Sequence, residues 1–161
     1  MGVRAMDKAQ AEAAVGELSQ GLGISGVSLG EAGNCLLAID DGAVLVHLGY
    51  NPGAASIDLM ICLDEIRPSP ADLARLMTAN FAWIGTDGGT FALEPQTGAL
   101  VVARRCNASD IVNHGLQRAL ESLVGVAEAW SKRLARSAAM DGGDEETSPE
   151  ARTPAMGVIR A

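Results

Sequence analysis

The sequence predicts an α+β domain in which a helix, three strands, a second helix, two strands and a long helix follow one another. We expect the strands to form a twisted antiparallel sheet packed by the helices. Between residues 34 and 63 the apolar residues alternate with a period of two, as they do in strands. Before and after that stretch they recur every three or four residues, as on one face of a helix.

The first helix is predicted over residues 5–22, where Val15, Leu18 and Leu22 form one apolar stripe that several glycines then end. Three strands follow, each with alternate apolar residues on one side of the sheet. Asp-Gly and Pro-Gly pairs between the strands supply tight turns. We expect these strands over residues 34–39, 43–50 and 56–63.

The second helix is predicted over residues 71–84. Ser69 fits the N-cap, Pro70 fits the first turn, and Asp72 complements the helix dipole. A single helical face carries the large apolar residues before a glycine-rich turn begins. These residues are Leu73, Leu76, Met77, Phe81 and Ile84.

A second hairpin and a long helix complete the domain. The hairpin strands are expected over residues 91–94 and 99–105, joined by a turn that contains proline and glycine. Ser109 is expected to cap the last helix, whose apolar stripe runs from Val112 to Leu134.

The composition changes near residue 138. Residues 138–161 hold five acidic residues and two arginines, and their apolar periodicity is lost. Such a segment buries too little apolar surface to offset its ordering entropy. We therefore divide the chain into an α+β domain at residues 1–137 and a flexible acidic C-terminal tail at residues 138–161.

Composition excludes several classes of protein. A net charge of −8 over 161 residues argues against binding to nucleic acid or to an anionic membrane. No stretch approaches the roughly 20 apolar residues of a membrane span, and the first six residues lack the apolar core of a signal peptide. Cys35, Cys62 and Cys106 are odd in number and far apart, which indicates buried free thiols in a reducing compartment. We expect a cytoplasmic protein.

The predicted sheet is apolar on both sides. If Val44 and Val46 face the core, Leu45 faces the other way, and Met60 opposes Leu59 in the same manner. At about 25 cal/mol per Å², a few hundred Å² of exposed aliphatic surface favours association by several kcal/mol. Two interpretations stay open: the helices cover both faces, or the second face binds a partner.

Three consecutive segments carry a family resemblance: Leu73–Phe81, Gly85–Glu94 and Gly98–Arg105. Together with the order of elements over roughly residues 5–134, they resemble the class I type III secretion chaperones, the Tir-chaperone (CesT) family. The resemblance implies a homodimer that binds the N-terminal segment of a secreted effector in the bacterial cytoplasm. The effector would lay apolar side chains into pockets and add strands to exposed edges, and the chaperone would present it to the secretion apparatus.

The resemblance also assigns roles to particular residues. The helix at residues 71–84 and the strand after it would supply the dimer interface, and the first helix and the sheet would receive the effector. The implied dimer residues are Leu73, Met77, Phe81, Trp83 and Phe91. The implied effector-binding residues are Val15, Leu18, Leu22, Leu36, Leu45, Met60 and Cys62.

Catalytic and metal-binding patterns are weak. Cys35 and His47 lie on neighbouring predicted strands, but no third group is evident to orient them as nucleophile and base, and His47 is expected to be partly buried. Two histidines and three cysteines are too dispersed for a metal site. We therefore expect no catalytic residue, no metal and no cofactor. The alternative function is a small α+β regulatory or scaffold module that docks on a folded signalling partner.

Overall fold

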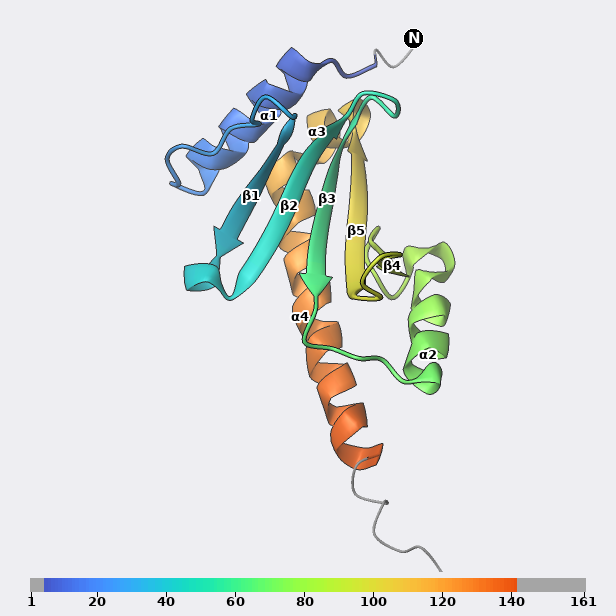
Figure 1. Ribbon diagram of the computed structural model, residues 1–161. Helices are drawn as coiled ribbons and strands as arrows, with labels where there is room; N and C mark the ends of the chain where they lie inside the picture. The colour runs from blue at the N-terminus through green and yellow to red at the C-terminus, as the bar shows by residue number, and fades with distance from the viewer. Residues whose placement is uncertain (1–4, 142–161) are drawn as a thin grey trace, which may run out of the picture.

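The structure is a computed structural model that describes residues 5–141. A five-stranded antiparallel sheet, in the order β1-β2-β3-β5-β4, lies against the long helix α4 (Figure 1). The predicted α+β fold class and order of elements are confirmed. The helices are α1 (Lys8–Gly21), α2 (Pro70–Asn80), α3 (Ala108–His114) and α4 (Leu116–Asp141), with 3-10 turns η1 (Asp40–Gly42) and η2 (Phe81–Trp83). The strands are β1 (Asn34–Ile39), β2 (Val44–Asn51), β3 (Ser56–Leu63), β4 (Thr90–Leu93) and β5 (Leu100–Asn107).

The core lies between one face of the sheet and the helices α1 and α4. Leu48, Ile57 and Leu59 of the sheet are at most 1% exposed, and so are Leu120 and Leu123 of α4. The inward positions of β2 and β3 are those that the period-two alternation predicts. The sheet therefore has an inner face, which α1 and α4 cover, and an outer face on the opposite side.

Helix α1 gives its apolar stripe to this core. Val15 is 0% exposed and Leu18 is 2% exposed, so both side chains are buried within the protomer. They are therefore not available for the effector contact that the family resemblance implies for them. An apolar stripe shows which side of a helix is covered, but it does not show whether the cover belongs to the same chain.

Helices α1, α2 and α3 each begin with a capping box. Ser69 caps α2 and accepts a hydrogen bond from the backbone N–H of Asp72, as predicted. The predicted cap at Ser109 is wrong: Asn107 caps α3, and its side chain accepts from the N–H of Asp110. The predicted single last helix is in fact two helices, because Gly115 at φ 77° ends α3 before α4 begins.

The break at Gly115 has a consequence for the predicted apolar stripe. Val112 was expected on the same buried face as the residues of α4, but it is 84% exposed. The change of backbone direction at Gly115 turns α3 out of phase with α4, so spacing along the sequence no longer predicts one common face.

Helix α2 ends at Asn80 and not at Ile84. Ala82 and Trp83 both adopt positive φ, 51° and 55°, which breaks the helical path over η2. As a result, Ile84 is 84% exposed and does not share a face with Leu76, which is buried.

At the C-terminal end, α4 continues through Asp141 and so includes the first residues of the predicted tail, 138–141. The rest of the predicted tail, residues 142–161, lies outside the described residues. Within residues 5–141, no helix has the length and apolar character needed to cross a membrane.

Candidate partner-binding surfaces

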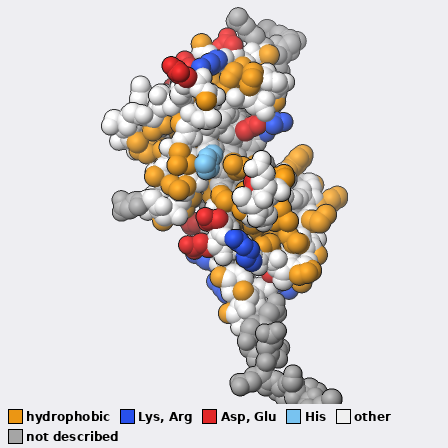
Figure 2. Space-filling model, in the orientation of Figure 1, with side chains coloured by type: hydrophobic (Ala, Val, Ile, Leu, Met, Phe, Trp, Pro, Cys, Tyr) orange, Lys and Arg blue, Asp and Glu red, His pale blue; other side chains and the backbone are white. Residues whose placement is uncertain are grey.

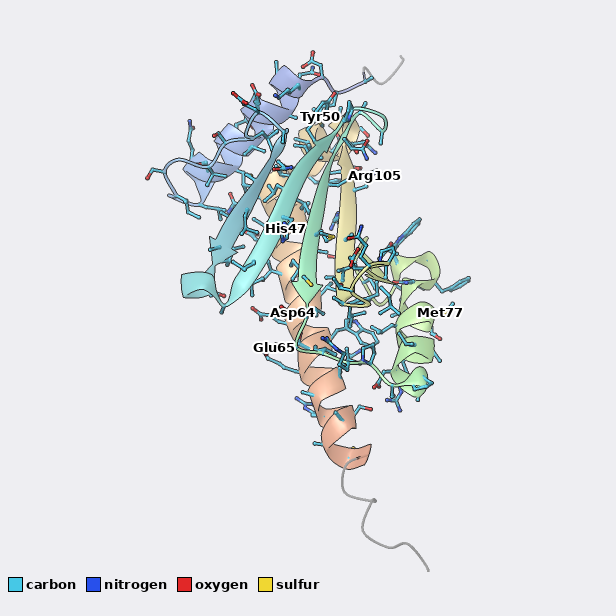
Figure 3. All side chains as sticks on the ribbon, in the orientation of Figure 1. His47, Tyr50, Asp64, Glu65, Met77 and Arg105 are labelled. Atoms are coloured by element: carbon cyan, nitrogen blue, oxygen red, sulfur yellow. The ribbon has the colours of Figure 1, made fainter. Side chains whose placement is uncertain are left out.

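The outer face of the sheet presents apolar side chains to solvent. Leu36 of β1 lies opposite His47 of β2, which lies opposite Met60 of β3. Leu36 is 54% exposed and Leu45 is 46% exposed. Figure 2 shows apolar side chains gathered around a histidine, which Figure 3 labels as His47 in the same orientation. His47 is exposed, not partly buried as predicted, because its position in β2 faces outward.

Four of the seven predicted effector-binding residues share this outer face. Met60 is partly buried and Cys62 is exposed, and both alternate with the buried residues of β3. Leu22 lies elsewhere, half-buried after the end of α1, in a groove of about 280 Å³ that Ile39 and Val124 also line. The apolar surplus of the sheet thus forms one continuous surface, which consists of Leu36, Leu45, Met60 and Cys62.

An ion pair borders this surface. Arg105 of β5 donates from Nε and Nη2 to the two carboxylate oxygens of Asp58, at 2.8 and 2.9 Å. Asn51 Nδ2 and Ser56 Oγ also donate to Asp58, each at 3.1 Å. The hydrogen bonds from Arg105, followed by those from Asn51 and Ser56, stabilise the charged carboxylate against its partial burial and lower the pKa of Asp58.

We expect the substitution Asp58→Asn to reduce the acid sensitivity of folding. Because the pKa of Asp58 is lower in the folded chain, its contribution to stability is fully present above the unfolded value, near pH 4, and is lost as the pH falls through the folded value. Urea unfolding at neutral pH and at about pH 3 should therefore give a smaller difference in free energy for Asp58→Asn than for the wild type. An equal difference in both proteins would contradict this assignment.

A second apolar surface lies where α2, η2 and β4 meet, and we call it the α2–β4 shelf. It consists of Met77 (74% exposed), Phe81 (76%), Trp83 (56%), Ile84 (84%) and Leu93 (45%). Beside it, a groove of about 320 Å³ runs between α2 and β4, and its lining includes Leu73, Met77 and Leu93. Figure 3 shows Met77 on α2, well separated from His47 on the sheet, so the shelf and the outer face are distinct regions.

Hydrogen bonds from side chains of α2, η2 and α4 fix the backbone that carries the shelf. The side chain of Asn80 accepts from the backbone N–H of Phe91 at 2.8 Å and donates to the carbonyl of Phe91 at 3.0 Å, so it pairs with β4 as another strand would. Trp83 Nε1 donates to Thr90 Oγ1 at 3.3 Å, and Trp130 Nε1 of α4 donates to the carbonyl of Gly85 at 3.1 Å. These bonds hold η2 in its strained backbone conformation, which points large apolar side chains toward solvent.

We expect Asn80→Ala to lower the free energy of unfolding by about 1–3 kcal/mol, because both hydrogen bonds to Phe91 are lost. The loss should also free β4 and η2 from each other and increase hydrogen exchange at the amide of Phe91. Thr78→Ala is the matched control, since Thr78 is exposed on the same helix and its hydroxyl donates to the carbonyl of Ala74, within the helix itself. Equal stability of the two variants would contradict the role of Asn80.

The sequence prediction for the dimer interface fits this surface in part. Met77, Phe81 and Trp83 are exposed and available for a partner, and Leu73 is half-buried at the groove. Phe91 is 6% exposed, with its ring 5.5 Å from that of Trp130, so it belongs to the core and does not fit the implied interface. Leu93, which the prediction did not name, is also exposed on this surface because it lies at the end of the edge strand β4.

The cysteines and histidines do not form the pair considered from the sequence. Cys35 lies opposite Leu48 and His47 lies opposite Leu36, so the two side chains point to opposite faces of the sheet. The predicted burial of the thiols is confirmed for Cys106, where burial raises the pKa to about 11, and is wrong for Cys62, which is exposed. In the described part of the chain, no group of three His, Cys, Asp or Glu residues is placed to hold a metal ion.

Comparisons with known proteins bear on these surfaces. The sequence profile of the Tir chaperone protein (CesT) family matches residues 14–131. The fold is similar to that of a chain in the crystal structure of the ExsC-ExsE complex, with a TM-score of 0.63 and 18% identity over 80% of this chain and 96% of that chain. It is also similar to a chain in the HopA1-SchA chaperone-effector complex, with a TM-score of 0.59 and 12% identity over 76% of this chain and 91% of that chain. No curated protein matches the sequence.

Proposed function

The chain belongs to the Tir chaperone protein (CesT) family, the type III secretion chaperones that bind effectors, and on that premise we propose that two copies form a homodimer that holds the N-terminal segment of one secreted effector. The dimer acts in the bacterial cytoplasm, keeps this segment soluble and presents it to the secretion apparatus. The chaperone acts by binding alone and needs neither a catalysed reaction nor a cofactor.

The observation that carries this proposal is the presence of two separate apolar surfaces on one protomer. A protein that only dimerises, or one that only binds an effector, needs a single apolar surface. A protein that does both needs two, and this protomer has the α2–β4 shelf and the outer face. Exposed apolar patches of this kind mark interaction sites in soluble proteins. Assigning the shelf to the twin subunit leaves the outer face, with Leu36, Leu45, Met60 and Cys62, for the effector.

Edge strands support the same assignment. In the described part of the sheet, β1 pairs only with β2, so beyond Asn34, whose carbonyl accepts from the N–H of Gly30, its other edge is open to an added strand. Leu36 lies on that edge strand, at the border of the outer face. An extended effector segment can therefore hydrogen-bond to β1 and place an apolar side chain against Leu36 in one binding mode, which is β-augmentation. The structures of the ExsC-ExsE and HopA1-SchA complexes each pair such a fold with a second protein.

The proposal is tested by affinity purification of the tagged protein from its native bacterium under secretion-inducing conditions. Mass spectrometry identifies the bound chains, and light scattering gives the mass of the complex. Two copies of this chain with one secreted protein, protected from proteolysis in its N-terminal portion, are the expected result. A stoichiometric folded cytosolic partner with no secreted protein would overturn the proposal in favour of a regulatory module.

A further inference from the structure

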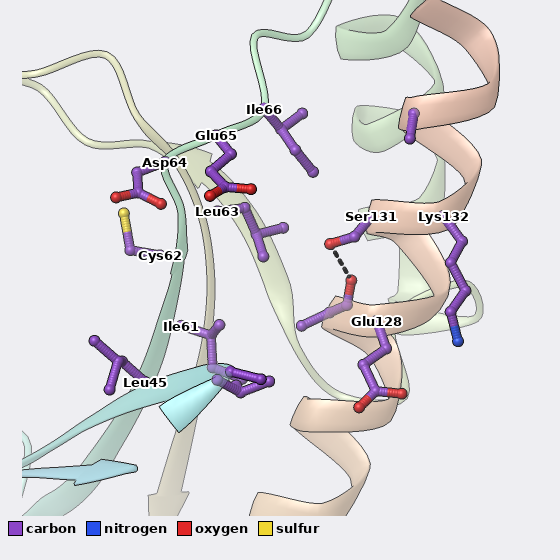
Figure 4. A pocket seen from close by; sticks show the side chains of 14 residues that line it. Leu45, Ile61, Cys62, Leu63, Asp64, Glu65, Ile66, Glu128, Ser131 and Lys132 are labelled. Atoms are coloured by element: carbon purple, nitrogen blue, oxygen red, sulfur yellow. Dashed lines mark hydrogen bonds between the residues drawn. The ribbon is translucent and has the colours of Figure 1, made fainter. Parts of the chain in front are cut away.

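A third concave surface lies away from the α2–β4 shelf and shares Leu45 and Cys62 with the outer face of the sheet. It is a groove of about 460 Å³ between the ends of β2 and β3, the loop after β3, and α4 (Figure 4). Val44, Leu63 and Ile66 line it and are each half-buried, and α4 closes the other side with small side chains such as Ala127. We call it the β3–α4 groove.

The rim of the β3–α4 groove is acidic. Asp64, Glu65 and Glu128 line it and are exposed, whereas Lys132 is the only cation that the described residues contribute to its lining. Within residues 5–141, none of these four side chains takes part in an ion pair. An apolar floor with unpaired carboxylates on the rim suits a segment that combines aliphatic side chains with arginine.

The end of this chain has that chemistry. Residues 151–161 contain Met156, Val158 and Ile159 together with Arg152 and Arg160, and they contain no acidic residue. The preceding stretch, residues 141–150, carries five acidic residues and no basic one. The charges of the two halves are therefore opposite, and only residues 151–161 complement the rim of the groove.

The connecting segment is long enough to make this contact. Ala135 is the last residue of α4 that lines the groove, and the helix ends at Asp141. The end of the helix is therefore about 9 Å beyond Ala135 along the helix axis. Residues 142–155 can span up to about 45 Å when extended. The extended length of this segment exceeds the distance back along α4 to the groove, so residues after 155 can reach it.

We propose that residues 156–160 of the same chain dock in the β3–α4 groove, with Val158 and Ile159 against the apolar floor and Arg160 among the carboxylates of Asp64, Glu65 and Glu128. This intramolecular contact covers the groove within one protomer. The proposed contact rests on the shape and charge of the groove and not on the proposed function, although a docked segment would also cover Leu45 and Cys62 of the outer face.

A natural thiol allows a direct test in the full-length protein. Cys62 lines the groove and is exposed, so the variant Ile159→Cys should form a disulfide with Cys62 within one chain under mild oxidation. Partial burial, followed by the nearby charges of Asp64 and Glu94, raises the pKa of Cys62, so the oxidation is run near pH 9. Non-reducing gels separate bonds within a chain from bonds between chains, and peptide mapping identifies the two cysteines.

The matched control is Thr147→Cys, which places a thiol in the acidic half of the same segment. In the urea-unfolded chain, which moves freely, the control should crosslink faster than Ile159→Cys, because its loop back to Cys62 is shorter. If the segment docks as proposed, Ile159→Cys should crosslink at least about tenfold faster than Thr147→Cys. Adding Asp64→Asn and Glu65→Gln to Ile159→Cys should then bring its rate down to that of the control.

Two outcomes would overturn the proposal. Equal rates for the two cysteine variants would show that the segment has no preferred place in the groove. A disulfide that joins two chains would show that the segment docks on a second copy. Circular dichroism of each variant verifies the fold, and the variant Cys62→Ser combined with Ile159→Cys verifies that the bond forms at the groove.

Discussion

Replacing Met77 and Trp83 together by aspartate converts the proposed dimer into monomers. Both side chains belong to the α2–β4 shelf, and burying two carboxylates in an apolar interface carries a large desolvation cost. Truncating an aromatic anchor at the centre of an interface alone costs 2 kcal/mol or more. We therefore expect the dissociation constant of the dimer to rise by about 1,000-fold, which corresponds to roughly 4 kcal/mol. Sedimentation velocity over a range of concentrations measures this change.

Because Met77 and Trp83 are exposed in the protomer, their replacement should affect dimer assembly and not folding. Met77 is 74% exposed and Trp83 is 56% exposed in the protomer, and the hydrogen bond from Trp83 to Thr90 that is lost is itself exposed, so the core of a monomer should remain folded. Val112→Asp is the matched control, because Val112 is a large apolar residue that is 84% exposed on α3, outside both apolar surfaces. A soluble double variant that remains dimeric like the control would refute the assignment of the shelf to the dimer.

The strands could be predicted well because their pattern depends on local alternation. The predicted range of the third strand, 56–63, agrees with β3 at both ends, and the outward positions of Met60 and Cys62 follow from the same period of two. The sheet places these residues beside Leu45 and Leu36, which lie on other strands. Alternation on each strand was thus enough to place these residues opposite the core without knowledge of the strand order, but it left open whether helices cover that face.

The α2–β4 shelf could be predicted only in part, because its form depends on contacts between distant residues. The spacing of Ile84 continues the helical face of Leu73 and Leu76, yet the helix stops at Asn80. The amide of Asn80 pairs with the backbone of Phe91, and Trp130 of α4 binds the carbonyl of Gly85. Neither partner lies within the window in which a periodic pattern is read.

Helix α1 shows the second limit of sequence reasoning. The apolar stripe of Val15 and Leu18 indicates that something packs on this face of the helix. It does not show whether that is the sheet of the same chain or a bound effector. In the structure the sheet and α4 cover it. A contact surface is therefore best recognised from apolar residues that remain exposed after the chain's own helices have been placed, as Leu36 and Leu45 do.

Replacing Leu36 and Leu45 together by aspartate should abolish effector binding and leave the dimer intact. Both residues lie on the outer face, 54% and 46% exposed, and an effector that covers them would bury two unpaired carboxylates. We expect the affinity for the effector captured with the wild-type protein to fall by about 100-fold or more, roughly 3 kcal/mol. Isothermal titration calorimetry with the N-terminal segment of that effector measures the loss.

The opposite behaviour of the two double variants is what distinguishes the two surfaces. The outer-face variant should sediment as a dimer but should not bind the effector. The Val112→Asp control should sediment as a dimer and should also bind the effector. Aspartate is unfavourable in strands by up to about 1 kcal/mol, so urea unfolding must show that the variant retains its fold. Because Leu36 and Leu45 lie on different strands, an effector that bound only through the backbone of β1 would tolerate Leu45→Asp alone. Wild-type affinity in the double variant would place the effector on another surface of the protein.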